Sequence, residues 1–378
     1  KGLALLRLFL IIHHQQRKMN RTNIHLNMRK KLRKSFFCLL STIIICLWLF
    51  SCDEHICKIY SNRSFEDIRS IAYNTKEAFC IVLVDSTQEL SREYCLKNKK
   101  NIDVNKTIYN IVDINISSNE WYMKWLCPLS LPLTCVFSEE GTLIDLIPGA
   151  TKETFLYTAK AISDKKITNY HYPNRFKLSK CTAISLLNQV LECKMDLDQG
   201  IYVPTVLSNP IDSLKYPYSF YWGIVGELME NDTVESKILA RSMLELETPY
   251  YLQLFKNEFI TAKKVLNPDF EINDEPSIRI DNDIVSLSDC KVGENVSFVI
   301  PIYNDGKYPL KISKIFTSCS CLSLIDHTKE FVVSPKDSVM VRFNFRSEES
   351  GEVTRDVFIT SNSINRPILY VKILADIS

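Results

Sequence analysis

The stretch VSFVIPIYNDGKYPLKISKIFTSCSC, residues 296–321, decides the fold of the C-terminal part of the chain. Apolar and polar residues nearly alternate over residues 296–300, as they do in a β-strand with one buried face. The tripeptide Asn304-Asp305-Gly306 is a turn signal, because its glycine tolerates a positive φ. A second run of strand length covers residues 310–317. This order of strand, turn and strand predicts an antiparallel sheet.

Further runs of strand length lie on both sides of this stretch, so residues 276–378 hold about seven predicted strands. All seven are short and are separated by turns: residues 278–287, 295–303, 310–317, 331–333, 338–345, 352–360 and 367–374. About seven short strands in roughly 100 residues are typical of an immunoglobulin-like sandwich. We therefore expect an all-β immunoglobulin-like domain over residues 276–378.

The same region carries motifs that are more specific than the fold class. They are N-x-G-x-x-P-L over residues 304–310, S-C-x-C over residues 318–321 and V-S-P over residues 333–335. This set closely resembles the bacterial domain of unknown function 1573, an immunoglobulin-like family common on envelope lipoproteins. The family usually has glycine where this chain has Ser320. The resemblance covers the whole region and implies an envelope protein.

Cys319 and Cys321 are two residues apart, so on a strand their side chains point to the same face. Three interpretations stay open. In the first, the two are small residues at a strand end, and one of them is bridged to Cys290. In the second, they form a soft-metal clamp with His327. In the third, they are a redox pair. A metal site normally needs three or four ligands, and only His327 is near in sequence. We therefore assign no metal site here and keep the pair as a candidate.

The segment Met28–Cys52 reads MRKKLRKSFFCLLSTIIICLWLFSC and has the form of an export signal. Cations near its start precede a mostly apolar run over residues 35–50, as in a signal peptide. The run ends in Leu49-Phe50-Ser51-Cys52, which resembles the bacterial lipoprotein box. The resemblance implies a signal peptide over residues 28–51, a lipid on Cys52 and stable membrane anchoring by two or more acyl chains.

An uncleaved membrane helix is the alternative interpretation of this segment. Its apolar run is shorter than the roughly 17–25 residues that span a bilayer, so we favour the lipoprotein. Residues 1–27 begin with Lys and fit no element, and we interpret them as an upstream extension from a mis-called start.

Residues 60–166 mix helical and strand patterns. A helical stretch over residues 65–72 precedes the apolar run FCIVLV at residues 79–84, which is typical of a strand covered on both faces. A second apolar run covers residues 107–116, and a third follows Leu131-Pro132. A helical pattern over residues 152–162 closes the region, which we expect to be an α/β domain.

This order, with Pro132 before a β-rich run and Gly141 and Gly149 in the turns, resembles the thioredoxin-like fold. In that family the matching proline is cis and faces the active site, and Pro128 is the competing position here. The family's chemistry needs a Cys pair where a central strand enters its helix, because the helix N-terminus lowers a thiol pKa. This chain has Ser86-Thr87-Gln88-Glu89 there. We therefore expect a thioredoxin-like domain that lacks CxxC and dithiol activity.

Residues 167–275 have helical patterns and are expected to form a helical spacer packed on a neighbour. A stripe of apolar residues at helical spacing covers residues 180–194. Further helical patterns follow over residues 219–230, 233–246 and 249–266. The stretch from Gly200 to Pro217 holds three prolines and is predicted to be a connection.

Charge and glycine spacing exclude two large classes of function. The first 51 residues hold ten of the 46 Lys and Arg and none of the 44 Asp and Glu, which leaves 36 basic against 44 acidic residues, a net charge of −8. A body this acidic does not favour binding to nucleic acid. The nine glycines form neither GxGxxG nor GxxxxGK[ST], which excludes Rossmann-type and P-loop nucleotide sites.

We expect a multi-domain, lipid-anchored protein of the cell envelope that binds or scaffolds an envelope protein and needs no cofactor. No catalytic constellation surrounds the histidines beyond Cys52. The alternative is a thiol–disulfide oxidoreductase or a metal-handling protein that uses Cys319 and Cys321. An unpaired thiol such as Cys95 is a further candidate for the redox role.

Overall fold

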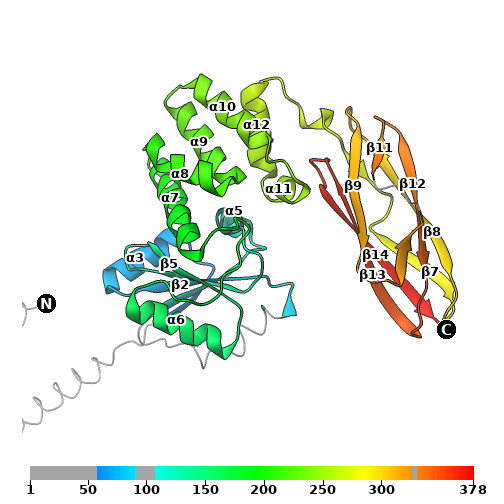
Figure 1. Ribbon diagram of the computed structural model, residues 1–378, viewed down its shortest axis with the longest axis horizontal. Helices are drawn as coiled ribbons and strands as arrows, with labels where there is room; N and C mark the ends of the chain where they lie inside the picture. The colour runs from blue at the N-terminus through cyan, green and yellow to red at the C-terminus, as the bar shows by residue number, and fades with distance from the viewer. Residues whose placement is uncertain (1–57, 90, 92–106, 326–329) are drawn as a thin grey trace, which may run out of the picture. The chain divides into compact units, whose positions relative to one another are not determined.

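The structure is a computed structural model and describes residues 58–89, 91, 107–325 and 330–378. The signal segment, Cys52, Cys95 and His327 lie outside the described residues, so the predictions on them stay predictions. The described part contains an α/β body that continues into a set of helices, and a C-terminal β-sandwich (Figure 1).

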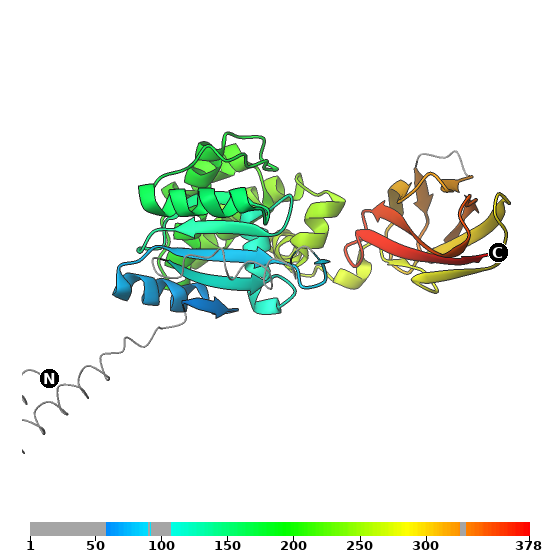
Figure 2. The ribbon, with the colours of Figure 1, turned by 90° about the horizontal axis from the view of Figure 1, so that it is seen from below.

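A five-stranded mixed sheet forms the centre of the α/β body, in the spatial order β1-β3-β2-β4-β5. The strands β1, β3 and β2 run parallel, whereas β4 is antiparallel to β2 and β5 is antiparallel to β4 (Figure 2). All six residues of β2 are buried, which explains the continuous apolar run in the sequence. The bounds are β1 (Ile59–Ser61), β2 (Phe79–Val84), β3 (Ile108–Asp113), β4 (Leu133–Phe137) and β5 (Leu143–Pro148).

Helices cover both faces of this sheet. One face packs against α3 (Phe65–Thr75), α5 (Glu120–Leu126) and α7 (Lys180–Asp198), and the other packs against α6 (Lys152–Asp164). Alternate residues of β2 therefore enter two different apolar cores. In Figure 1, α6 and α7 lie on opposite sides of the sheet.

Two helix starts follow from capping residues in the sequence. The Ser64 hydroxyl accepts a hydrogen bond from the backbone N–H of Asp67 and begins α3. Thr151 and Thr154 bond each other's backbone N–H groups in a capping box and begin α6. Because these caps satisfy N–H groups that have no partner within the helix, they fix where each helix starts.

Residues 167–275 are mainly helical, as predicted, but the prediction of a connection between Gly200 and Pro217 is wrong. Residues 204–214 instead form α8. Pro204 is the first residue of this helix, and Pro217 is the first residue of the next helix. A proline at the first helical position gives up no hydrogen bond. The helices are α8 (Pro204–Leu214), α9 (Pro217–Met229), α10 (Thr233–Leu244), α11 (Pro249–Leu254) and α12 (Lys256–Leu266).

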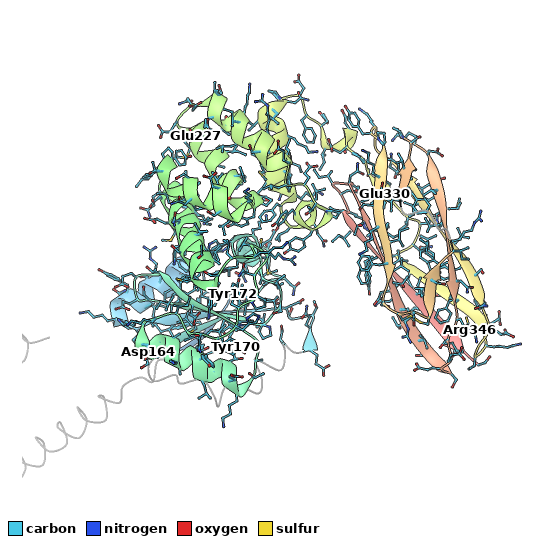
Figure 3. All side chains as sticks on the ribbon, viewed as in Figure 1. Asp164, Tyr170, Tyr172, Glu227, Glu330 and Arg346 are labelled. Carbon is cyan, nitrogen blue, oxygen red and sulfur yellow. A yellow bond between two sulfur atoms is a disulfide. The ribbon has the colours of Figure 1, made fainter. Side chains whose placement is uncertain are left out.

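These helices share one apolar core with the α/β sheet. The indole N–H of Trp125 on α5 donates to the carbonyl of Leu187 on α7 at 2.9 Å. The ammonium of Lys124 pairs with the carboxylate of Glu258 on α12 at 2.8 Å, and both side chains are buried. Figure 3 shows the side chains that fill the space between helices and sheet. Residues 167–275 therefore pack on the α/β body.

The C-terminal part is a sandwich of two sheets, as predicted. One sheet has the order β10-β12-β8-β6 and the other β11-β9-β13-β14-β7. Their inward-facing apolar side chains form a separate core. The bounds are β6 (Ile278–Arg279), β7 (Ile284–Cys290), β8 (Val296–Asn304), β9 (Leu310–Thr317), β10 (Leu322–Leu324), β11 (Phe331–Val333), β12 (Ser338–Phe345), β13 (Gly351–Ser361) and β14 (Ile368–Ile377).

The predicted strands agree with this sandwich in most places. Three runs have the predicted bounds, and three others differ by a few residues at their ends. The first predicted run is split into β6 and β7, and β10 lies where the sequence predicts no strand. The three residues of β10 pair with β12, a contact with a distant segment that no local pattern marks.

Candidate functional site

The carboxyl ends of β2 and β3 carry a network of polar side chains in the α/β body. Asp85 accepts hydrogen bonds from the backbone N–H and the hydroxyl of Thr87, at 2.9 and 2.6 Å. The Asn115 amide donates to Asp85 at 2.8 Å and to Asp113 at 3.0 Å. Asp113 also accepts from the backbone N–H of Ser86 at 3.3 Å. The side chains at this edge therefore bond mainly to one another.

Both carboxylates of this network have a lowered pKa. Burial acts to raise the pKa of Asp85, but hydrogen bonds from Thr87, Asn115 and Gln88 outweigh it. The pKa of Asp113 is lowered in the same way, by bonds from Ser86 and Asn115 that outweigh burial. Both groups are ionised at neutral pH, so they are not poised to exchange a proton there.

Pro132 lies beside this edge of the sheet, directly before β4. The Leu131–Pro132 peptide bond is cis, whereas the bond before Pro128 is not. The carbonyl of Pro132 accepts a hydrogen bond from the backbone N–H of Gly149 at 2.8 Å. Pro132 itself is buried, and the loop before it exposes the apolar side chain of Leu129.

Four of the described free cysteines of the α/β body and its helices are buried, whereas Cys181, on α7, is exposed. Cys80, Cys127 and Cys135 are almost fully buried, and burial raises the pKa of each thiol. Burial likewise raises the pKa of Cys193, on α7, to about 12. A buried thiol with a raised pKa forms little thiolate and is a poor nucleophile. These cysteines act as small apolar residues of the core.

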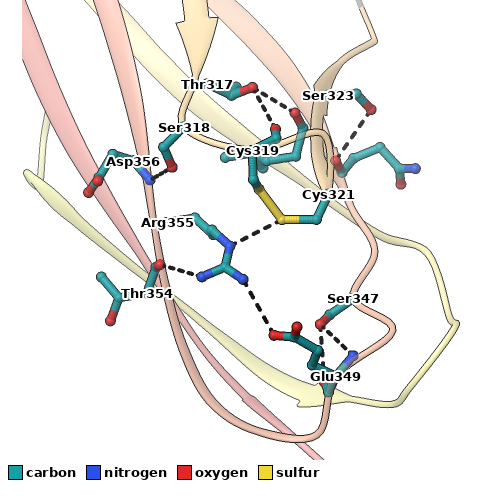
Figure 4. The surroundings of a disulfide bond; sticks show 12 residues. Thr317, Ser318, Cys319, Cys321, Ser323, Ser347, Glu349, Thr354, Arg355 and Asp356 are labelled. Atoms are coloured by element: carbon teal, nitrogen blue, oxygen red, sulfur yellow. Dashed lines mark hydrogen bonds and ion pairs between the residues drawn. A yellow bond between two sulfur atoms is a disulfide. The ribbon is translucent and has the colours of Figure 1, made fainter.

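Cys319 and Cys321 form a disulfide with each other. It lies in the turn that leads from β9 in one sheet to β10 in the other. The Thr317 hydroxyl braces this turn, at 3.0 Å from the carbonyl oxygen of Cys319 and 2.9 Å from that of Leu322. Both cysteines are partly exposed and pack against the apolar core. Figure 4 shows the disulfide and the contacts of Thr317.

The side chain of Arg355, on β13, approaches only one of the two sulfurs. Its Nε donates to the Sγ of Cys321 at 3.2 Å, and a second nitrogen donates to the carbonyl of Thr354 at 2.9 Å. The carboxylate of Glu349 lies 3.9 Å from the guanidinium and is largely exposed (Figure 4). A cation therefore lies beside Cys321, and no local sequence pattern marks this contact.

The disulfide decides between some of the open interpretations of the cysteine pair. The proposed bridge to Cys290 is wrong, because Cys290 is a free, buried cysteine. His327, the third residue of the alternative metal clamp, lies outside the described residues. Within the described ranges, no group of three or more His, Cys, Asp or Glu side chains is arranged to hold a metal ion.

As a structural staple this disulfide is weak. In the chain-entropy model, closing a three-residue loop stabilises a fold by about 1.6 kcal/mol, against about 3 kcal/mol for a 15-residue loop. Cys319 and Cys321 are only two positions apart in the sequence. The disulfide therefore contributes less to the stability of the sandwich than the apolar core does.

The N-x-G motif at residues 304–306 of the C-terminal part has a structural role. Asn304 is fully buried, and its side chain accepts hydrogen bonds from the backbone N–H groups of Gly306 and Ser277, at 3.0 and 3.3 Å. Its amide donates to the carbonyls of Tyr308 and Val333, at 2.8 and 3.0 Å. One side chain thus holds together the turn and two neighbouring segments.

Comparison with known protein families identifies the C-terminal part. The model of the HYDIN/CFA65/VesB-like Ig-like domain matches residues 276–375. This part of the chain is therefore an immunoglobulin-like domain. A comparison with curated proteins finds none that matches the chain. In the part that the structure describes, no helix is both long and apolar enough to cross a membrane.

Solved structures that resemble the chain do so over about a third of its length or less. A protein of unknown function from Porphyromonas gingivalis W83 is 19% identical over 29% of this chain and 50% of its own, with a TM-score of 0.24. The ASH/PapD-like domain of human CEP192 is 10% identical over 29% and 89%, with a TM-score of 0.23. The VesB protease of Vibrio cholerae is 13% identical over 32% and 35%, with a TM-score of 0.23. Likenesses of this size do not identify a function.

Proposed function

We propose that this chain is a lipid-anchored protein of the bacterial cell envelope whose folded part binds a partner protein without catalysing a reaction. The anchor is argued from Cys52 and the cationic and apolar segment before it. The non-catalytic role rests mainly on the network at the carboxyl ends of β2 and β3. There Asp85, Thr87 and Asn115 bond to one another instead of presenting a nucleophile and a base.

The α/β body is, in this proposal, a thioredoxin-like fold used as a scaffold. Its strand order and strand directions support this assignment, since β4 runs antiparallel to the other four strands of the sheet. The cis bond before Pro132 supports it as well. Ser86-Thr87-Gln88-Glu89 occupies the position of the CxxC motif of that family, so this edge of the sheet is assigned a binding role.

The C-terminal domain is, in this proposal, of the type of domain of unknown function 1573. The motif residues that suggested the resemblance are the ones with structural roles. Asn304 bonds four backbone groups, and Gly306 lies where an added Cβ would come within 2.0 Å of the Glu275 carbonyl oxygen. Such constraints explain why this turn needs these two residues.

A photo-crosslinking experiment tests the binding role. Leu129, in the loop before Pro132, is 47% exposed and is the site for a photoreactive amino acid in the full chain in intact cells. Lys160, an exposed residue of α6 on the other face of the sheet, is the matched control. The proposal predicts a defined envelope protein linked at position 129 and not at 160. Equal amounts of cross-linked product at the two positions, or no cross-linked product at either position, would contradict the proposal.

An insulin-reduction assay tests the absence of catalysis. The full chain and its Cys319→Ser/Cys321→Ser variant are assayed with a dithiol reductant. The proposal predicts that neither protein speeds the reaction beyond the reductant alone. Turnover by both proteins would assign an oxidoreductase to another thiol, and turnover by the unmodified chain alone would assign it to Cys319 and Cys321.

A further inference from the structure

The disulfide in the immunoglobulin-like domain has two properties that a structural staple does not need. Cys319 and Cys321 are partly exposed, and the side chains of Ser318 and Ser320 beside them are exposed. A thiol in solution can therefore approach the sulfur pair from the side of the turn. The bond joins residues that the chain already holds close together, so the two sheets do not depend on it.

The surroundings of the two sulfurs differ in charge. The guanidinium of Arg355 donates a hydrogen bond to the Sγ of Cys321 at 3.2 Å and not to the Sγ of Cys319. A neighbouring arginine lowers the pKa of a cysteine thiol because it stabilises the thiolate. In thiol–disulfide exchange, the sulfur with the lower pKa leaves faster. The geometry therefore gives the disulfide a preferred direction of cleavage.

We propose that the Cys319–Cys321 disulfide is an exchangeable bond that captures an exposed cysteine thiol as a mixed disulfide on Cys319. The thiol first loses its proton to solvent, and its thiolate attacks the Sγ of Cys319. A new sulfur–sulfur bond forms to Cys319 while the old one breaks, and its electron pair leaves on Cys321 as a thiolate. The guanidinium of Arg355 balances that charge.

The mixed disulfide has two fates, and bonds and electrons balance in both. The Cys321 thiolate attacks the mixed disulfide and restores the starting state, or a second thiol of the partner attacks its own mixed-disulfide sulfur. In the second case the partner dithiol is oxidised to a disulfide, and Cys319 and Cys321 are reduced to thiols. The capture is stoichiometric and reversible, so it adds covalent binding to the proposed non-catalytic role and does not depend on the lipid anchor.

Among the free cysteines that the structure describes, Cys181, on α7, is exposed and the others are buried. Cys290, in the same domain, is buried, as are the cysteines on the strands of the α/β body. A sulfur that is out of contact with solvent does not meet an incoming thiol. Within the described ranges, the Cys319–Cys321 bond is therefore the disulfide open to an incoming thiol, and the exposed Cys181 lies outside the immunoglobulin-like domain.

The experiment uses the full chain at pH 7 with reduced glutathione as the probe and iodoacetamide as the trap. Fragment masses then locate each modification. The proposal predicts molecules with glutathione on Cys319 and the alkyl group on Cys321, without unfolding. The reverse arrangement, an even mixture, or a disulfide that reacts only in denaturant would each overturn it. This readout needs no variant, and it is separate from both insulin turnover and cross-linking.

A matched pair of variants tests the role of the cation. Arg355→Gln removes the charge beside Cys321, and Arg346→Gln removes an exposed arginine of the same domain that pairs with Glu348 (Figure 3). A change of about one pKa unit in the leaving thiol slows exchange by about three- to tenfold. We expect this loss in Arg355→Gln and an unchanged rate in Arg346→Gln. Equal rates in all three folded proteins would refute the role of Arg355.

Discussion

Asp145, on β5, is a fully buried carboxylate whose removal tests how the α/β body is held to its helices. One oxygen pairs with the ammonium of Lys180, the first residue of α7. The other accepts the backbone N–H and the hydroxyl of Thr168, at 2.9 and 2.6 Å. Lys180 also donates to the carbonyl of Tyr170 at 3.1 Å. The cluster therefore joins the sheet, the segment after α6 and the start of α7.

The change Asp145→Ala leaves the Lys180 ammonium and two Thr168 donors without their acceptor. Removing one partner of a buried ion pair costs about 3–5 kcal/mol, out of a total folding stability of about 5–15 kcal/mol. Asp145→Ala/Lys180→Met removes the stranded charge as well. We expect this double variant to be more stable than Asp145→Ala by about 1 kcal/mol or more.

The loss of folding stability caused by Asp145→Ala should also depend on pH. Burial lowers the pKa of Lys180, and the pairing with Asp145 opposes that shift. Without Asp145 the folded-state pKa falls further below the unfolded value. A lysine with a depressed folded-state pKa destabilises the fold where it is charged, and this loss disappears as the pH rises toward about 10.4. The deficit of Asp145→Ala should therefore shrink between pH 7 and pH 9.

Urea unfolding followed by tryptophan fluorescence measures this effect. Every tryptophan beyond Cys52 lies in the α/β body and its helices, at positions 121, 125 and 222, so the signal reports on this part alone. Glu139→Ala, which removes an exposed ion pair with Lys165, is the control and should cost under about 1 kcal/mol. If Asp145→Ala costs no more than this control, the reasoning about the buried pair is refuted.

Three further outcomes follow from the same contacts. Gly306→Ala should lower the free energy of unfolding of the immunoglobulin-like domain by about 2–4 kcal/mol, because the new Cβ meets the Glu275 carbonyl oxygen. An unchanged unfolding temperature of this variant would argue against that contact. Asp85 and Asp113 have lowered folded-state pKa values, so their stabilisation is present above about pH 4 and is lost as the pH falls through the folded-state values. Urea unfolding at pH 3 and pH 7 should therefore show a smaller acid loss in Asp85→Asn than in the parent, and an equal loss would count against the network. Brief alkylation of the native chain should label the exposed Cys181 and spare the cysteines on β2 and β4, as peptide mapping can show, and labelling of the buried thiols would contradict their burial.

Much of the sandwich could be predicted because its strands leave a local pattern. In β12, buried Val341, Phe343 and Phe345 alternate with more exposed residues, and the sequence shows this period directly. The apolar run of β2 was also readable, because both of its faces are covered. A pattern within one strand needs no knowledge of its neighbours.

Features that depend on distant residues could not be predicted in the same way. The contact between Arg355 and Cys321 joins residues 34 positions apart, and no local pattern marks it. The pairing of Cys319 with Cys321 does not follow from the sequence, because spacing does not determine disulfide connectivity. The prolines near α8 predict a break in the chain, whereas in the structure Pro204 occupies the first helical position and Pro210 lies within the helix.

Metabolic labelling with a radioactive fatty acid tests the central claim, which is the lipid anchor on Cys52, most directly. The parent chain is compared with Cys52→Ser and with Cys46→Ser, which changes a cysteine of the preceding apolar run. We predict label in the parent and in Cys46→Ser, both in the membrane fraction, and no label in Cys52→Ser. An unlabelled parent chain found in the soluble fraction of the cell would contradict the account.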